Sequence, residues 1–144
     1  MSEPTVDTKL LQGAPFFAGL SSEDLEGILR VGRSVSFEAG QTIVEQGDLG
    51  DGMYIITGGA AEVDVGGRFH RLKTGDIFGE MALVSAGKRM ATVKAVEPVE
   101  ALMIPADGFH TFLEAHPAVA LSMLKAVVER LREVEQRIDA WMAS

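Results

Sequence analysis

One segment of the sequence combines two features that bind anions in proteins, the start of a helix and an arginine. An apolar run ends at Phe78, Gly79 follows, and Glu80 begins a single apolar turn that precedes Arg89. The first amides of a helix have no hydrogen-bond partners within it, so they bind anions. The planar guanidinium of an arginine matches the oxygens of a phosphate. An isolated arginine at a strand start is more often solvated, so the prediction of an anion site depends on the combination.

The other reactive residue types do not form a second site. The chain has no cysteine, which excludes thiolate metal sites, iron–sulfur clusters and a cysteine nucleophile. Its three histidines, His70, His110 and His116, lack the spacing of a metal site, and we expect them at the surface or at helix ends. A nucleotide-triphosphate loop is excluded by Ala82 and Arg89, and no nucleophile elbow is present. We therefore predict that the protein is not an enzyme and holds no metal ion or cofactor.

Charge and composition exclude several classes of partner. The net charge of −8 argues against nucleic acid, whose phosphates need a basic protein face. With 47% hydrophobic and 24% charged residues, the chain has the composition of a folded protein. No apolar run approaches the roughly 18 residues of a membrane span, and the polar, acidic N-terminus does not resemble a signal peptide. Because cysteine is also absent, we expect a cytoplasmic protein without a membrane or nucleic-acid partner.

The periodicity of the chain changes twice, and this predicts the fold. Residues 6–31 have helical spacing, residues 33–104 form short apolar runs broken by glycine, and residues 106–142 are helical again. We predict one domain over residues 1–144 with a mainly β fold. Its centre is expected to be an eight-stranded β-roll or jelly-roll barrel, flanked by N-terminal helices, a short phosphate-binding helix and two C-terminal helices.

Local signals fix some of these elements. Ser21 precedes two acidic residues, as at a helix start. Gly66-Gly67 lies between alternating strands and predicts a tight hairpin, because glycine adopts positive φ at little cost. Pro117 is expected in the first turn of a long helix. Methionines in apolar runs are expected to fill the core, namely Met53, Met81 and Met103.

The anion-binding segment resembles the phosphate-binding cassette of cyclic nucleotide-binding domains. The resemblance is carried by Phe78-Gly79-Glu80-Met81-Ala82-Leu83, by Arg89 and by Ala91-Thr92-Val93. Two upstream glycine motifs, Gly47-Asp48-x-Gly50-Asp51-x-x-Tyr54-x-Ile56 and Leu72-x-x-Gly75-Asp76, match the same family. The family includes the regulatory subunits of protein kinase A, cyclic nucleotide-gated channels and the bacterial catabolite activator protein. The resemblance extends from about Leu10 to Arg137.

The resemblance implies a role for each matching residue. The arginine at the position of Arg89 holds the cyclic phosphate, and the glutamate at the position of Glu80 accepts a hydrogen bond from the ribose 2′-hydroxyl. Backbone amides at the positions of Gly79, Ala82 and either Met90 or Ala91 complete the phosphate site. The ligand-binding residues that we expect are therefore Phe78, Gly79, Glu80, Met81, Ala82, Arg89, Met90, Ala91 and Thr92.

Two positions depart from the pattern of the family. Lys88 stands where the family usually has proline, which loosens the loop and adds a positive charge. Met90 stands where relatives selective for cGMP carry threonine, whose hydroxyl bonds to guanine. Because methionine offers no such donor, we expect cAMP to be preferred over cGMP.

The long C-terminal helix carries a regular apolar stripe. Its members are spaced by three and four residues, namely Leu121, Leu124, Val128, Leu131, Val134, Ile138 and Trp141. The first half of the stripe is expected in the core, but the helix is longer than the β-roll beside it. The second half either folds over the bound base, pairs with a second chain, or stays solvated. The resemblance places Arg130, Val134 and Glu135 where relatives contact the base.

These observations predict a regulatory binding module of bacterial type that senses a cyclic nucleotide, preferably cAMP. Binding is expected to move the C-terminal helix, and the partner is a second copy of the chain or an unidentified effector protein. One alternative is a transcription regulator of the catabolite activator type without its DNA-binding domain, since the chain ends at Ser144. Another alternative is an interaction domain that binds no ligand.

Overall fold

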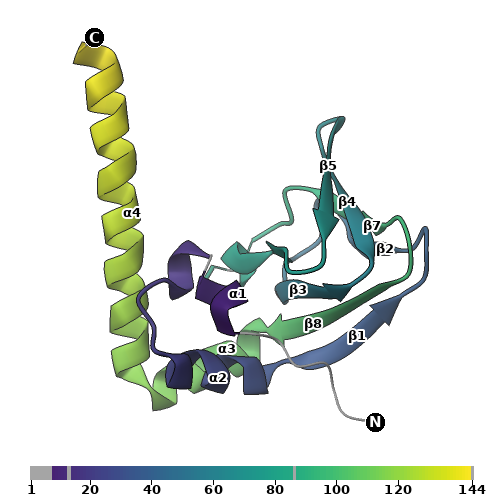
Figure 1. Cartoon of the computed structure of the whole chain (residues 1–144), viewed down its shortest axis with the longest axis horizontal. Helices are drawn as coiled ribbons and strands as arrows, with labels where there is room; N and C mark the ends of the chain where they lie inside the picture. The colour runs from purple at the N-terminus through teal and green to yellow at the C-terminus, as the bar shows by residue number, and fades with distance from the viewer. Residues whose placement is uncertain (1–7, 13, 86, 144) are drawn as a thin grey trace.

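The computed structural model describes residues 8–12, 14–85 and 87–143, so residues 6, 7 and 13 of the expected helical part lie outside it. Figure 1 shows a β-roll with helices gathered at one end and a long C-terminal helix that projects away from the strands. The helical elements are α1 (Thr8–Gln12), η1 (Pro15–Phe17), α2 (Ser22–Val31), η2 (Glu80–Leu83), α3 (Ala106–Ala115) and α4 (Pro117–Ala143).

The described residues form eight strands in two antiparallel four-stranded sheets, as the glycine-broken apolar runs predict. The sheet orders are β1-β8-β3-β6 and β2-β7-β4-β5. The strands are β1 (Arg33–Phe37), β2 (Thr42–Val44), β3 (Gly52–Gly58), β4 (Ala60–Val65), β5 (Arg68–Lys73), β6 (Ile77–Phe78), β7 (Thr92–Ala95) and β8 (Val99–Pro105). The predicted fold class is confirmed.

The predicted turns and caps are present. Gly66 and Gly67 connect β4 to β5 with φ of +58° and +85°, which makes the expected hairpin. The hydroxyl of Ser21 accepts a hydrogen bond from the amide of Asp24 (3.2 Å) and caps α2. The N-terminal part is broken before α2, because Ala14 precedes a proline and adopts extended backbone angles (φ −86°, ψ 134°).

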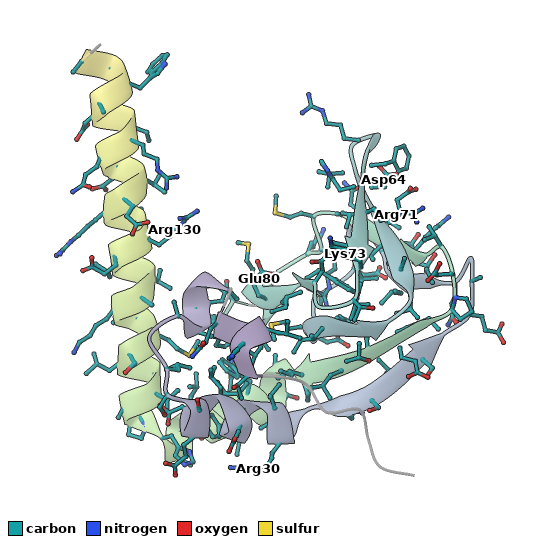
Figure 2. All side chains as sticks on the ribbon, in the orientation of Figure 1. Arg30, Asp64, Arg71, Lys73, Glu80 and Arg130 are labelled. Atoms are coloured by element: carbon teal, nitrogen blue, oxygen red, sulfur yellow. The ribbon has the colours of Figure 1, made fainter. Side chains whose placement is uncertain are left out.

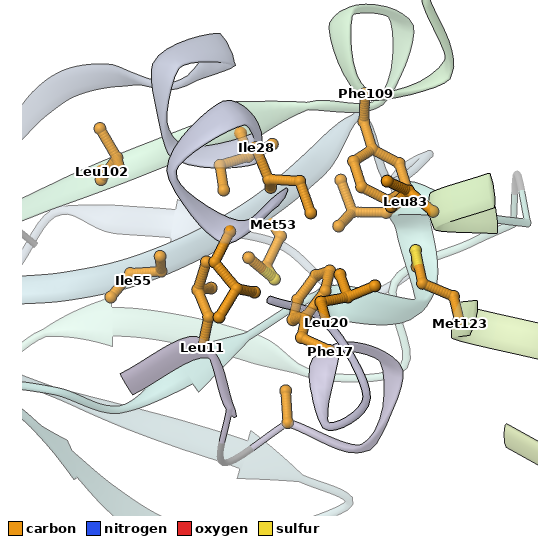
Figure 3. Packing of buried hydrophobic residues seen from close by; sticks show 14 residues of the cluster. Leu11, Phe17, Leu20, Ile28, Met53, Ile55, Leu83, Leu102, Phe109 and Met123 are labelled. Carbon is orange, nitrogen blue, oxygen red and sulfur yellow. The ribbon is translucent and has the colours of Figure 1, made fainter. Parts of the chain in front are cut away.

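Two apolar clusters hold the fold together. One lies between the two sheets and includes Ile56, Val93 and Val99. The other packs the helices against the first sheet, and Figure 3 shows Leu83 of η2 beside Phe109 of α3 in this cluster. The short helix at the anion-binding segment is thus anchored in the same core as the C-terminal helices.

The C-terminal helix contributes little of its apolar stripe to the core. Val119 and Met123 are its buried residues, whereas Leu121 and Leu124 are 53% and 59% exposed. The expectation that the first half of the stripe is buried is therefore wrong, because α4 turns the face of Val119 and Met123 toward the core, and Leu121 lies on another face of the same turns. Within the described residues, no single helix is both long and apolar enough to cross a bilayer. The pair α3 and α4, bent by 110°, meets those two criteria only when it is taken together.

Candidate functional site

The backbone around Arg89 is fixed by pairing with an earlier turn of the chain. The amide of Arg89 donates to the carbonyl of Asp48 (2.7 Å), and the carbonyl of Arg89 accepts from the amide of Gly47 (2.9 Å). The amide of Gly50 donates to the carbonyl of Gly87 (2.9 Å). The first glycine motif of the sequence therefore positions the arginine that follows it about forty residues later.

The side chain of Arg89 lies almost wholly inside the protein. It is 8% exposed, and its Nη2 donates to the carbonyl of Gly52 (2.9 Å) and lies 3.2 Å from Asp51 Oδ1. The guanidinium carbon lies 5.9 Å from the centre of the Tyr54 ring, which is within range of a cation–π contact. Asp51 is 74% exposed, so solvent also screens the pair.

Two glycines provide the space for this arginine. Gly79 precedes η2 with φ of +79°, and a Cβ at this position would collide with Arg89 Nη1. A Cβ at Gly50 would lie 2.8 Å from Ala82 Cβ and 3.3 Å from Arg89 Nε. Because glycine stands at both positions, the guanidinium of Arg89 reaches the start of η2. The structure therefore brings together the helix start and the arginine from which the sequence predicts an anion site.

These residues border a cavity of about 310 Å³. Every expected ligand-binding residue except Thr92 lines it, namely Phe78, Gly79, Glu80, Met81, Ala82, Arg89, Met90 and Ala91. Thr92 instead uses Oγ1 to accept a hydrogen bond from the amide of Gln46 (3.0 Å). It therefore lies behind the loop and braces the turn that holds Arg89.

Sequence reasoning missed part of the cavity wall. The lining residues that were not among the expected ligand-binding residues are Val44, Gly50, Val63, Ser85, Gly87, Lys88 and Val93, although the sequence already singled out Lys88 for its positive charge. Val93 pairs with Val44 on one side and with Val63 on the other, so three strands present valines at one level of the sheet. Strand alternation shows that each valine faces inward. Nothing in the sequence predicted the register in which β2, β7 and β4 pair.

The cavity has an apolar side and a charged side. Phe78 and the three valines form its apolar side. Phe78 stacks on Tyr54 with ring centres 5.0 Å apart. Burial raises the pKa of the Tyr54 phenol, and the carboxylate of Asp51 raises it further. Glu80, Lys88 and Arg89 supply the charged side, and Ser85 adds a hydroxyl.

The rim of the cavity is apolar and exposed. Met81 and Met90 are 64% and 75% exposed, and both line the cavity. The prediction that Met81 fills the core is wrong, because the short turn of η2 directs Leu83 inward and leaves Met81 outside. Met53 and Met103 are buried as expected.

The residues expected to cover a base lie on α4, and no described residue of α4 lines the cavity. Arg130 pairs with Glu133 of its own helix (3.5 Å) and borders a separate groove with Ala14, Ala18 and Gly19. Val134 and Glu135 are exposed one turn further along. Figure 2 shows Arg130 on α4 and Glu80 on the β-roll, well separated in the view. A role in covering a ligand therefore requires α4 to move.

The histidines lie as expected, on the surface or at a helix end. His70 is exposed on β5, and His116 caps the end of α3. His110 is exposed on α3, and its Nε2 donates a hydrogen bond to the carbonyl of Leu83. Within the described part of the chain, no group of three histidine or acidic side chains is arranged to hold a metal ion.

Comparisons with known proteins identify a family model and several relatives that match this chain in sequence. The sequence model described as "Cyclic nucleotide-binding domain" matches residues 34–116, more than half of the chain. The chain is 30% identical over 135 residues to the cyclic AMP receptor protein of Thermus thermophilus, an alignment that covers 90% of this chain and 62% of that protein. It is 34% identical over 122 residues to a cyclic nucleotide-gated potassium channel of Rhizobium etli, covering 85% of this chain and 34% of the channel.

A solved structure shares the fold over nearly its whole length. It is the N-terminal domain of a transcriptional regulator from Streptomyces coelicolor, with a TM-score of 0.76 and 29% identity. The match covers 88% of this chain and 95% of that one. The chain spans less than two thirds of the length of the two curated relatives above.

Proposed function

The chain belongs to the cyclic nucleotide-binding domain family, and from this premise we propose that it binds cAMP as a regulatory module without catalytic activity. The family is one of regulatory ligand-binding domains. The ligand is expected in the cavity between η2 and the loop of Arg89. The observation that carries this proposal is the buried guanidinium of Arg89, which Asp51 and Gly52 hold beside the open start of η2.

The two sides of the cavity suit the two ends of a cyclic nucleotide. A phosphate beside η2 would accept hydrogen bonds from the Arg89 guanidinium and from backbone amides at the turn, which are charge-assisted and strong. Glu80 borders the same space and would accept from the ribose 2′-hydroxyl, which is a donor. The surface of Phe78, Val44, Val63 and Val93 would contact the base through apolar and ring contacts.

The preference for cAMP over cGMP is supported by Met90. Its side chain lines the cavity, and a thioether offers guanine no hydrogen-bond donor. Guanine differs from adenine in the polar groups of its edge, so a site without a matching donor leaves those groups unpaired. We therefore expect a lower Kd for cAMP than for cGMP in the same titration.

Coupling to the C-terminal helices is supported by two contacts behind the site. The carbonyl of Asp51, the residue whose side chain holds Arg89, accepts from the amide of Ala106 at the start of α3 (2.8 Å). Leu83, the last residue of η2, packs in one cluster with Phe109 and Met123. A ligand that shifts η2 or the Arg89–Asp51 pair therefore acts directly on α3, which leads into α4. We propose that this moves α4 toward the ligand, with Arg130, Val134 or Glu135 over the base.

A second candidate function is the sensor part of a transcription regulator. It is favoured by the likeness to the N-terminal domain of the Streptomyces regulator and by partial coverage of the Thermus receptor. In this case a second copy of the chain is the expected partner, since α4 has an exposed apolar stripe. An effector protein of another kind is the alternative partner.

The test is calorimetric titration of cAMP and cGMP into the wild type and Arg89→Ala. Removing one partner of a desolvated charge pair costs roughly 2–5 kcal/mol, or about thirty-fold to several thousand-fold in Kd. Arg71→Ala is the matched control, because Arg71 is exposed on β5 and does not border the cavity. Saturating cAMP, at about one hundred times its Kd, should stabilise the wild type by about 2.7 kcal/mol.

Arg89→Ala should still fold, because the Asp51 carboxylate that it leaves behind is mostly in solvent. Binding of cAMP by this variant within about threefold of the wild type would contradict the assignment of the site. Binding of neither nucleotide by the wild type would contradict the proposed function itself.

A further inference from the structure

The charges that line the cavity nearly cancel. Glu80, Lys88 and Arg89 are its charged lining residues, and the charge of Arg89 is opposed by Asp51 at 3.2 Å. Without Lys88, the Arg89–Asp51 pair and Glu80 would leave this side of the cavity with a net negative charge. The chain as a whole carries a net charge of −8, so its overall field repels an anion. An anionic ligand therefore needs a local positive charge that is not already neutralised.

Lys88 lies at the cavity wall, where such a positive charge is needed. Its backbone is bridged to Leu49, and this bridge is flanked by the hydrogen bonds from Arg89 to Asp48 (2.7 Å) and from Gly50 to Gly87 (2.9 Å). The base of the side chain is therefore fixed at the cavity wall. Among the residues that the structure describes, no acidic group lies within ion-pair distance of its ammonium group.

We propose that Lys88 is a further ligand-binding residue, whose ammonium group supplies the uncompensated positive charge that attracts the anionic phosphate of the ligand. The proposal rests on the proposed function, because it assumes that a cyclic nucleotide occupies this cavity. Arg89, which is buried and already paired with Asp51, then supplies directed hydrogen bonds to the phosphate. Lys88, which is exposed, supplies the net positive charge. A flexible ammonium acts as a point charge without the directional fork of a guanidinium.

The effect of Lys88 should follow charge and salt. Ion pairs at exposed positions are worth little, so neutralising Lys88 should weaken cAMP binding by about two- to fivefold at low salt. The difference should disappear near 1 M salt, where the screening length falls to about 3 Å. Because the phosphate is common to both nucleotides, the fold-change should be the same for cAMP and cGMP.

The experiment measures the Kd of cAMP and cGMP for the wild type, Lys88→Arg, Lys88→Gln and Lys88→Glu at low and high salt. Lys94→Gln is the matched control, because Lys94 is exposed on β7 next to Val93 but does not line the cavity. At low salt, log Kd should change stepwise with the charge at position 88, with Lys88→Arg close to the wild type. Lys94→Gln should bind as the wild type does.

Three results would overturn the proposal: equal Kd values for Lys88→Gln and the wild type at low salt, a loss that persists at high salt, or an equal loss in Lys94→Gln. Melting of each variant without ligand separates a folding defect from a binding defect. If the wild type binds tightly and Lys88→Gln is unchanged, only the role of Lys88 is wrong. If the wild type binds neither nucleotide, the proposed function is wrong.

Discussion

The site depends on two glycines, Gly50 and Gly79, as much as on the charged side chain of Arg89 beside them. Arg89 is buried because Gly50 and Gly79 leave room for its guanidinium and because Asp51 and the carbonyl of Gly52 hold it. Gly79 also has a positive φ, which other residues adopt at a cost. The position before η2 therefore controls both the turn and the arginine.

Gly79→Ala should weaken cAMP binding by tenfold or more and also destabilise the fold. The left-handed backbone costs a non-glycine residue roughly 1–2 kcal/mol, and the added Cβ displaces Arg89 Nη1. Gly66→Ala is the control, because Gly66 also has a positive φ of +58°, lies outside the cavity lining, and a Cβ there meets no atom within 4 Å. Calorimetric titration and thermal melting measure the two effects. Equal affinity of the two variants for cAMP would show that Arg89 tolerates displacement.

Glu80→Ala should weaken cAMP strongly and 2′-deoxy-cAMP much less. The carboxylate of Glu80 borders the cavity in which the phosphate is expected, and beside that anion an acid is favourable only if it accepts from a ligand hydroxyl. The deoxy analogue lacks that hydroxyl, so removing Glu80 costs it little. Competition titration gives the Kd of cAMP and of 2′-deoxy-cAMP for the wild type and for Glu80→Ala. The four values show whether the loss caused by Glu80→Ala depends on the 2′-hydroxyl. Equal losses for the two ligands would refute a ribose contact.

At the scale of elements, η2 is joined to α3 by a polar contact as well as by packing. His110 Nε2 lies 2.5 Å from the carbonyl of Leu83, the last residue of η2. This carbonyl is an acceptor, so Nε2 carries the proton and donates. Figure 3 shows Leu83 beside Phe109, the residue of α3 that precedes His110. Together they hold the ligand-binding turn against the helix that leads into α4.

His110→Ala should lower the free energy of unfolding by about 0.5–1.5 kcal/mol, the usual net value of one hydrogen bond. It should also increase hydrogen exchange in η2, because the carbonyl of Leu83 loses its anchor. His70→Ala is the control, since His70 is exposed on β5. Chemical denaturation and hydrogen exchange measure these effects. Unchanged exchange in η2 would show that packing alone joins η2 to α3.

The distal half of α4 should become more protected when cAMP binds. Leu131, Val134 and Ile138 are exposed at helical spacing, and the rim residues Met81 and Met90 are exposed at the cavity. Contact between these apolar surfaces would remove both from water. Hydrogen exchange with and without cAMP should therefore slow over residues 130–141, and Arg89→Ala should abolish the change. Movement of α4 over the ligand would be excluded if exchange over that stretch did not respond to saturating cAMP.

At the scale of the whole molecule, α4 carries an exposed apolar surface on which we expect a second copy of the chain to pair. Leu124, Leu131 and Ile138 recur every seven residues, and Val127 and Val134 lie three residues after the first two. This is the spacing of the buried positions in a coiled coil. These apolar residues would form the seam between two helices. Arg130 and Glu135 lie on either side of it with opposite charges, which suits a parallel pair of helices.

Leu131→Asp should convert a dimer into a monomer without unfolding the chain, since Leu131 is 56% exposed. A charge at a buried seam position is costly, whereas one on a solvated helix is not. Sedimentation equilibrium at several concentrations measures the association, with Lys125→Asp on an exposed part of the same helix as the control. A wild type that stays monomeric at every concentration would exclude this interface.

The sequence alone determined the strands, the glycine turns, the helix starts and the cassette of Glu80 and Arg89. These features are local, because backbone geometry, capping and motif spacing act over a few residues. The tertiary structure decided which distant residues meet. Val44, Val63 and Val93 share a wall through strand register, Asp51 holds Arg89 through the turn that pairs with its loop, and Lys88 joins the cavity by the same pairing.

The tertiary structure also decided which apolar residues are buried. Periodicity defines a face of η2 or α4, but it does not say what covers that face. Met81 is exposed because Leu83 occupies the inward position of a turn only four residues long. Leu121 and Leu124 are exposed because the inward face of these turns of α4 is the one that carries Val119 and Met123. Burial depends on the neighbour, and the neighbour is set by the path of the whole chain.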